Sequence, residues 1–317
     1  MMSDSILKRA IKDQRFLLAL VILGIIIIIA VINPKFIAIT NLITVFQQIS
    51  VLGILTMAMS ILLISGGIDL SVGNIMVLSG IIISKALSSG ISLFPALIAG
   101  CTVGIFAGFF NGIIIAKTKC IPLIITLGTA QIFYGISLTI SSGRIMSFYG
   151  ALNGLKYKFF SIFPAMLLVL FVMTFSAYIL MNKTKFGRRV VAIGGNEKNA
   201  FLSGINVTSY KIAVYTLAGF FSAIAGIVFA ARIDSITANA GSGYETNALT
   251  AAIIGGVTFD GGKGTIPGAF LGCLLMGVIS NAMNILRVPT YIQTVITGCI
   301  IVCAVILSNI NNLRKNN

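Results

Sequence analysis

Between Lys35 and Lys85 the chain carries a single charged side chain, Asp69. Residues 41–84 built as one straight helix would be about 66 Å long, whereas the hydrocarbon core of a bilayer is about 30 Å thick. The segment therefore has to fold back on itself, and Gly66-Gly67 supplies the break. We predict two membrane spans here, at 41–64 and 71–87.

Similar apolar runs recur along the sequence. They predict eight further spans, at about 16–32, 94–116, 121–140, 161–181, 212–231, 243–259, 265–286 and 289–308. Charged residues make up only 9% of the chain, whereas soluble domains carry about 25%. We therefore expect an all-α polytopic membrane protein with about ten transmembrane helices. The stretch between Glu245 and Asp260 is also short enough for a re-entrant segment, which is the alternative to a full span at 243–259.

The basic residues favour one orientation. Most of them fall in the N-terminal segment, in the long loop 182–211 and in other connections that the ten-span map places on the same side. Cytoplasmic loops are enriched in Lys and Arg, so both termini are predicted to be cytosolic. The chain then divides into a cytosolic N-terminus at 1–15, a transmembrane domain at 16–308 and a cytosolic tail at 309–317.

The composition excludes most catalytic chemistry. The chain has no histidine, and its seven acids are scattered, so a Ser-His-Asp triad, a histidine metal site and a carboxylate pair are not expected. The net charge of +15 is spread over loops, which argues against nucleic acid as a partner. The segment 261–265 lacks the glycine and lysine spacing of a P-loop. We expect no catalytic residue, metal or cofactor on this chain, and any ATP or Mg²⁺ on a partner.

Two glycine-rich motifs each contain an acid. Charge inside a membrane is expensive, so Asp69 should face protein, water or the membrane boundary. One interpretation is a broken helix lining a translocation pathway, and the other is a tight turn in which Asp69 caps the next helix. The candidate pathway residues are Gly66, Gly67, Asp69, Ser71 and Gly73 in the first motif, and Gly255, Gly256 and Asp260 in the second.

The likeness of the two motifs suggests an internal repeat. Repeats of five spans should be inverted, however, and the ten-span map places both glycine turns on the same side of the membrane. Two unrelated turns with similar residues are the alternative.

Small and amide side chains inside the spans predict helix packing. Glycines spaced by four at positions 100, 104, 108 and 112 form one helix face, and Gly268 and Gly272 repeat the pattern. Close helix contact is the expected role, with a pore-lining groove as the alternative. For Asn111, Asn281 and Asn284 we expect interhelical hydrogen bonds rather than solute contact.

The basic loop 182–211 contains a short helix signal. A capping asparagine precedes a helical stretch that a glycine ends. We expect an amphipathic helix that exposes Ala200, Phe201 and Leu202, and a docked protein would need such a surface. The candidate docking residues are Asn196, Glu197, Ala200, Phe201, Leu202, Gly204 and Ile205.

From about residue 16 to 308, the sequence resembles the permease subunits of ribose-type sugar ABC importers. The motifs that carry the resemblance are Gly66 through Gly73, Ala192 through Glu197, Leu202 through Asn206, and Gly255-Gly256 through Gly264-Thr265. The loop also resembles the coupling motif of ABC importers, although only Ala200 and Gly204 match, and Lys198 and Asn199 stand in place of its first two residues.

The resemblance implies a permease fold in the bacterial cytoplasmic membrane. It also implies a second permease copy or a paralogue with the solute path between the two, and cytosolic ATPase subunits docked at 182–211. An extracytoplasmic sugar-binding protein would deliver the solute. We expect a monosaccharide such as a pentose, with autoinducer-2, inositol or nucleosides as alternatives in the same family. A stand-alone secondary transporter would need its own coupling-ion site, for which one intramembrane acid is a poor basis.

Overall fold

The computed structural model describes residues 14–316, with side chains for residues 15–306. The predicted N-terminal segment 1–15 therefore lies almost entirely outside the described residues. The described helices are α2 (Gln14–Ile32), η1 (Pro34–Ile37), α3 (Ile39–Ile64), α4 (Val72–Ser88), α5 (Leu93–Thr118), α6 (Pro122–Ser141), η2 (Asn153–Lys156), α7 (Ala165–Lys183), α8 (Lys185–Gly195), α9 (Glu197–Leu202), α10 (Val207–Ile233), α11 (Tyr244–Ile254), α12 (Ile266–Ile285) and α13 (Thr290–Asn316).

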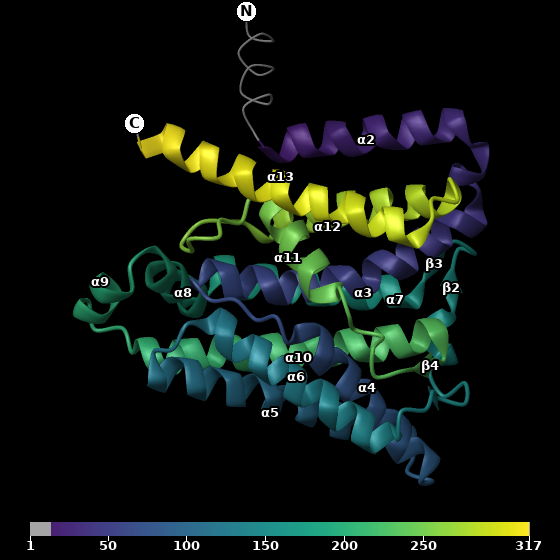
Figure 1. The fold of residues 1–317 in the computed structure, drawn as a ribbon, viewed down its shortest axis with the longest axis horizontal. Coiled ribbons are helices and arrows are strands. Elements are labelled where there is room, and N and C mark those ends of the chain that lie inside the picture. The colour runs from purple at the N-terminus through teal and green to yellow at the C-terminus, as the bar shows by residue number, and fades with distance from the viewer. Residues whose placement is uncertain (1–13, 317) are drawn as a thin grey trace, which may run out of the picture.

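Most of the long helices run along one axis and define two ends of the molecule (Figure 1). The α8 end carries α8 and α9. The opposite end carries two short antiparallel pairs, β1 (Met146–Ser147) with β4 (Ser235–Ile236), and β2 (Lys158–Phe159) with β3 (Phe163–Pro164). The chain enters α2 and leaves α13 at the α8 end, as a ten-pass arrangement requires.

Seven of the described helices are long and apolar enough to cross a membrane: α2, α3, α5, α6, α7, α10 and α12. The apolar helices at Val72–Ser88 and Thr290–Ile306 are shorter. The span predicted at 161–181 begins later, at Ala165, because residues 158–164 form the β2–β3 hairpin. The loop predicted at 182–211 contains α8, α9 and the start of α10, and α13 continues through much of the predicted tail.

Helix α3 is the centre of the bundle. Most of its membrane-length window, 83%, is buried inside the protein, whereas only 11% of the corresponding window of α2 is buried. Helix α3 packs against α7, α10, α11 and α12, and α2 lies outside against α12. Helix α2 therefore presents most of its apolar surface to lipid, which explains its high hydrophobicity.

Two helices are discontinuous. The first comprises the irregular segment 65–71, which enters from the α8 end, followed by α4, which runs to the opposite end. The second comprises the segment 237–243, which enters from the opposite end, followed by α11, which runs to the α8 end. Their helical N-termini meet where Gly73 faces Gly241, and a Cβ on Gly73 would lie 2.6 Å from the Gly241 carbonyl oxygen.

The prediction of a helical span over 243–259 is wrong in its last five residues, 255–259. Helix α11 ends at Ile254, and at about 16 Å it is too short to cross a bilayer. Gly255 stops it by packing directly on the backbone of α12, where its Cβ would lie 2.5 Å from the Cα of Ala269. The segment 237–243, a series of turns, completes the passage, so the loop at 255–265 returns to the α8 end.

The two glycine motifs are therefore not equivalent positions of an inverted repeat. Gly66-Gly67 precedes a half-helix, whereas Gly255-Gly256 follows one. Both turns lie at the α8 end, where Gly66 approaches Gly261 of the second turn. This arrangement agrees with the alternative of two unrelated turns with similar residues.

The predicted glycine packing face is confirmed. On α5, Gly104 and Gly108 lie against the backbone of Gly219 on α10, and Gly112 lies against Ile212. On α12, Gly268 and Gly272 contact the end of α11 in the same manner. Asn281 also forms the predicted interhelical bond, because its side-chain amide pairs reciprocally with that of Asn41 on α3 at 2.9 Å.

We expect Gly108→Ala to destabilise the helical bundle by about 1–3 kcal/mol, the usual cost of overpacking a filled core. The added methyl group would overlap the Tyr215 carbonyl oxygen and lie 3.0 Å from the Gly219 Cα. Gly135→Ala is the matched control, because a Cβ on Gly135 has no neighbour within 4 Å among the described residues. Thermal unfolding in detergent measures both variants. Equal melting temperatures for the two would contradict the tight α5–α10 contact.

Candidate translocation site and docking surface

Asp69 is fully buried in the irregular segment before α4. One carboxylate oxygen accepts hydrogen bonds from the Ser71 backbone N–H at 2.7 Å and the Ser71 hydroxyl at 2.6 Å. The other accepts from the Asn111 side-chain amide of α5 at 3.1 Å. The nearby Tyr215 hydroxyl of α10 donates to the Ile68 carbonyl oxygen at 3.0 Å. The segment is thereby anchored to α5 and α10.

This environment shows why an acid is tolerated so deep in the bundle. Asp69 faces protein. Its carboxylate accepts hydrogen bonds from the two Ser71 donors of the turn, which has no helical partners of its own, and from Asn111 of α5. Asn111 forms the interhelical bond that its position predicts. Asp69 binds Ser71 before α4 begins, which is close to the capping role considered for it, although the N-cap residue is Ser71.

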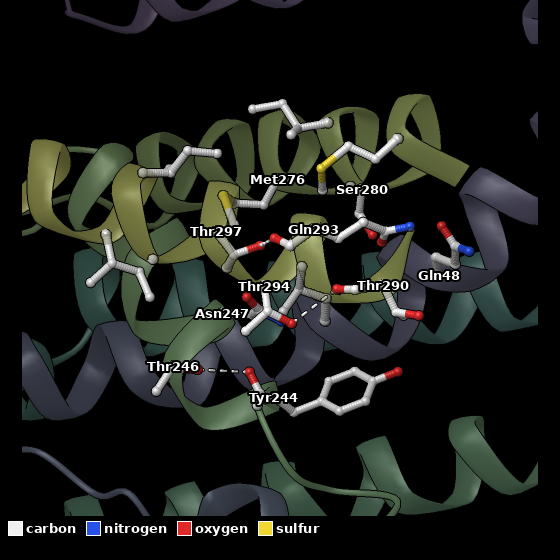
Figure 2. A pocket seen from close by; sticks show the side chains of 18 of the residues that line it. Gln48, Tyr244, Thr246, Asn247, Met276, Ser280, Thr290, Gln293, Thr294 and Thr297 are labelled. Carbon is white, nitrogen blue, oxygen red and sulfur yellow. Dashed lines mark hydrogen bonds between the residues drawn. The ribbon is translucent and has the colours of Figure 1, made fainter. Parts of the chain in front are cut away.

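A polar cavity of about 560 Å³ lies between α3, α11, α12 and α13 (Figure 2). Its lining extends from Arg232 and Thr290, near the opposite end, to Tyr244 and Met276 at mid-molecule. The volume is in the range of small-molecule sites. The polar lining residues are Gln48, Arg232, Ser242, Tyr244, Thr246, Asn247, Ser280, Thr290, Gln293, Thr294 and Thr297.

Apart from the Arg232 guanidinium, the polar groups of the lining are neutral hydrogen-bonding groups. The hydroxyls of Thr246, Thr294 and Thr297 donate to backbone carbonyls earlier in the chain at 3.0, 3.1 and 2.8 Å. Their oxygens can still accept a hydrogen bond. The buried side-chain oxygen of Gln48 has no donor within the described residues. A solute that carries hydroxyl groups can supply such donors.

The eight predicted pathway residues do not line this cavity. Asp69 and Ser71 lie in the anchored turn, and Gly73 lies at the contact of the two half-helices. The glycines at 66–67 and 255–256 lie in turns at the α8 end, and the Asp260 side chain is exposed. A role for these residues in the pathway stays a prediction.

The sequence contains a signal for the cavity lining, which the prediction of membrane spans did not use. In the apolar run 289–308, the hydroxyl residues Thr290, Thr294 and Thr297 recur at helical spacing, with Gln293 beside them. Such a stripe predicts a polar helix face. Gln48 adds an amide from a different span, and only the fold shows that α3 and α13 border the same space.

The docking segment folds as a compact corner between α8, α9 and α10. The Asn196 side chain caps α9 by accepting from the Asn199 N–H at 2.9 Å, as predicted. Gly204 adopts φ +80° just after the helix, in the left-handed region that favours glycine. Phe201 and Leu202 are 69% and 71% exposed, which leaves an apolar pair on the surface.

The expectation that Ala200 is exposed is wrong. Ala200 is only 4% exposed and packs with Ile193 of α8 and Val207 of α10, with Ile205 beside them. A six-residue helix has too little apolar surface to fold alone, and this small cluster fixes it against its neighbours. The buried face of the docking segment therefore holds it in place, and the exposed face is formed by Phe201 and Leu202.

Polar contacts reinforce the corner. Glu197 of α9 forms an ion pair with Lys211 of α10, with 2.6 Å between the carboxylate oxygen and the ammonium nitrogen. The Arg189 guanidinium of α8 lies over the Tyr210 ring, 5.5 Å from its centroid, and donates to its hydroxyl. Phe186 packs on the same ring. All three helices are thus connected to one another.

Comparison with known proteins agrees with this architecture. Residues 41–305 match the family described as branched-chain amino acid transport system / permease component. The chain belongs to this permease family. As a permease component with seven membrane-length apolar helices, it is a multi-pass protein of the bacterial cytoplasmic membrane, as predicted.

Curated relatives cover almost the whole permease. The chain is 37% identical over 285 residues to the ribose import permease protein RbsC of Bacillus subtilis, which covers 89% of this chain and 88% of the relative. It is 38% identical over 287 residues to the D-allose transport system permease protein AlsC of Escherichia coli, covering 88% and 86%. The galactose/methyl galactoside import permease protein MglC of E. coli is 33% identical over 309 residues, covering 89% and 90%. These matches confirm the resemblance to ribose-type permeases, and no solved structure gives a significant match.

Proposed function

We propose that the chain is the membrane-spanning subunit of an ATP-driven importer for a neutral monosaccharide. The observation that carries the proposal is the cavity, because amide and hydroxyl groups converge there inside an otherwise apolar bundle. Weak, neutral contacts suit a transport path that has to release its solute. The names of the relatives, which refer to ribose, D-allose and galactose, support a monosaccharide.

The α8 end is proposed to face the cytosol. Lys183, Lys185, Arg188 and Arg189 lie at this end, consistent with the bias of cytoplasmic segments toward basic residues. The exposed pair Phe201–Leu202 on the segment 182–211 would then contact an ATPase subunit. The cavity lies in the half of the molecule away from that subunit, toward the side from which a binding protein delivers solute.

ATP binding and high affinity for the solute are proposed to belong to partner subunits. ATP and Mg²⁺ would bind to the ATPase, and high affinity for the sugar would belong to the extracytoplasmic binding protein. The eight pathway residues predicted from the sequence would act by shaping the half-helices around the cavity, and a second copy of the permease would complete the path. Motion of the docked ATPases would alternate access to the cavity between the two sides.

Reconstitution tests the proposal. The binding protein encoded with the permease is first screened by thermal shift against ribose, allose, galactose, inositol, nucleosides and autoinducer-2. Proteoliposomes with permease, ATPase and binding protein should then accumulate the stabilising solute only with ATP. If the binding protein were stabilised by a ligand other than a sugar, the proposed solute would be that ligand and not a monosaccharide. Concentrative uptake by the permease alone would overturn it in favour of a secondary transporter.

We expect Gln48→Met to slow uptake while it stabilises the fold. Methionine has a similar shape but removes a buried oxygen without a donor, and such an atom costs about 1–3 kcal/mol. The solute would lose one hydrogen bond of about 0.5–1.5 kcal/mol, so uptake should fall roughly two- to tenfold. Thermal unfolding and initial uptake rates measure the two effects.

Gln47→Met is the matched control, because Gln47 precedes Gln48 on α3 and does not line the cavity. Its uptake should match that of the wild type. Unchanged uptake by Gln48→Met would remove the cavity from the solute path.

A further inference from the structure

Three chain segments from distant parts of the sequence meet at the α8 end through backbone atoms, most of them from glycines. They are the last turn of α8 at Gly194, the turn at 64–67 after α3, and the loop at 255–265 after α11. We call this contact the glycine junction and define it by Ile64, Gly66, Gly194, Gly261 and Gly262.

The glycine junction is packed backbone against backbone. The Gly262 N–H donates to the Ile64 carbonyl oxygen at 2.9 Å. A Cβ on Gly194 would overlap that same oxygen and lie 2.6 Å from the Gly262 nitrogen. A Cβ on Gly261 would lie 2.7 Å from the Gly194 carbonyl oxygen and 2.8 Å from the Gly66 Cα. The junction therefore has no side chain that could yield when one segment moves.

The segments that meet there lead to both half-helices. From Gly66 the chain continues through the anchored Asp69 turn into α4, and the loop that contains Gly261 follows directly from α11. From Gly194 the chain passes to Asn196, which caps the docking helix α9. One contact thus connects the docking corner to the two discontinuous helices, and α11 lines the cavity.

We propose that the glycine junction transmits displacement of the docking corner to the two half-helices and thereby couples ATP hydrolysis to opening of the cavity. This inference rests on the proposed function. Close-packed backbone transmits movement with little compliance. Competing routes run from the docking corner to α10, through the packing of Ala200 on Val207 and through the Glu197–Lys211 ion pair. The ion pair is partly exposed, and such surface pairs contribute only about 0–1 kcal/mol. The ion pair positions the corner, and the glycine junction carries its motion.

Gly194→Ala tests the junction, and Gly195→Ala is its matched control. The two glycines are adjacent in the last turn of α8, but a Cβ on Gly195 has no neighbour within 4 Å among the described residues. Both variants are reconstituted with the ATPase and the binding protein. The decisive readout is solute transported per ATP hydrolysed, measured together with ATPase affinity and thermal stability. A purely structural role would change stability and leave that ratio unchanged.

We expect Gly194→Ala to bind the ATPase with wild-type affinity and to lower the transport ratio at least about fivefold, the lower limit of usual coupling between sites. Gly195→Ala should match the wild type. A wild-type ratio in a folded Gly194→Ala variant would overturn the inference. Absence of ATP-dependent uptake in both the wild type and Gly195→Ala would instead overturn the proposed function.

A second variant decides the question if Gly194→Ala does not fold. Insertion of Gly-Ser-Gly between Phe259 and Asp260, both exposed, lengthens the connection from α11 to the junction without a steric clash. The same insertion between Gly90 and Ile91, which are exposed in the α4–α5 connection, is the control. The first insertion should lower the transport ratio and the second should not. Equal ratios for the two would overturn the inference.

Discussion

Asp69→Leu is expected to remove almost all folded permease from the membrane. The substitution leaves the Ser71 N–H and the Ser71 hydroxyl without their acceptor, and the Asn111 amide keeps only its hydrogen bond to the Ser71 hydroxyl oxygen. Each buried donor left unpaired costs about 1–3 kcal/mol, so the sum takes up much of the 5–15 kcal/mol by which folded proteins are typically stable. Membrane-fraction yield and size-exclusion profile in detergent measure the loss.

Asp69→Asn is the control that isolates hydrogen bonding from charge. Asparagine keeps an acceptor oxygen within reach of both Ser71 donors and removes a carboxylate that is fully buried. We expect this variant to fold and to transport. Normal yield and uptake by Asp69→Leu would show that the anchored turn is incidental to the fold.

Gly204→Val is expected to uncouple ATP hydrolysis from uptake without loss of the inserted permease. Gly204 has φ +80°, and a β-branched residue is rarely found in that conformation. The strain of about 1–3 kcal/mol is relieved if the end of α9 shifts, which displaces Phe201 and Leu202 from the docking surface. ATPase stimulation and uptake in proteoliposomes should both fall, by at least about fivefold.

Gly204→Asn tests whether the effect of valine comes from backbone strain or from steric crowding by the side chain. Asparagine tolerates the left-handed region, and a Cβ at this position meets no atom within 4 Å among the described residues. We expect its uptake to stay near the wild-type rate. If Gly204→Val transported normally, the exposed pair on α9 would not be the ATPase contact.

The positions of most helices could be predicted from the sequence, because a lipid environment imposes a simple rule. A run without charge must be helical and must be about as long as the membrane is thick. The spans predicted at 41–64 and 71–87 agree closely with α3 and α4, and the break between them falls at Gly66-Gly67 as expected. The docking helix was also predictable, because the Asn196 cap and the Gly204 stop are local signals.

The second discontinuous helix was not predictable by the same rule. Hydropathy continues past Ile254, and α11 ends at Gly255-Gly256, where Gly256 adopts φ +87° and Gly255 packs on the backbone of α12. The span predicted over 243–259 did not use this double glycine. The lining of the cavity was missed for a related reason. An isolated polar residue in a span usually bonds to a neighbouring helix, as Asn281 does. Only the fold distinguishes it from Gln48, which lines the cavity and whose buried oxygen has no donor among the described residues.

The irregular segment 237–243 lies beside the cavity and is not part of a helix. Non-helical backbone is tolerated inside a bilayer only where it is buried in protein or borders an aqueous space, and Ser242 and Gly243 border the cavity. A permanently wet half-channel would leak ions if it were continuous. The seal must therefore be the dry layer between the cavity and the α8 end, where the buried side chains of Ile253 and Val257 lie. In every transport cycle this layer has to open for one sugar molecule and close again before protons can pass through it.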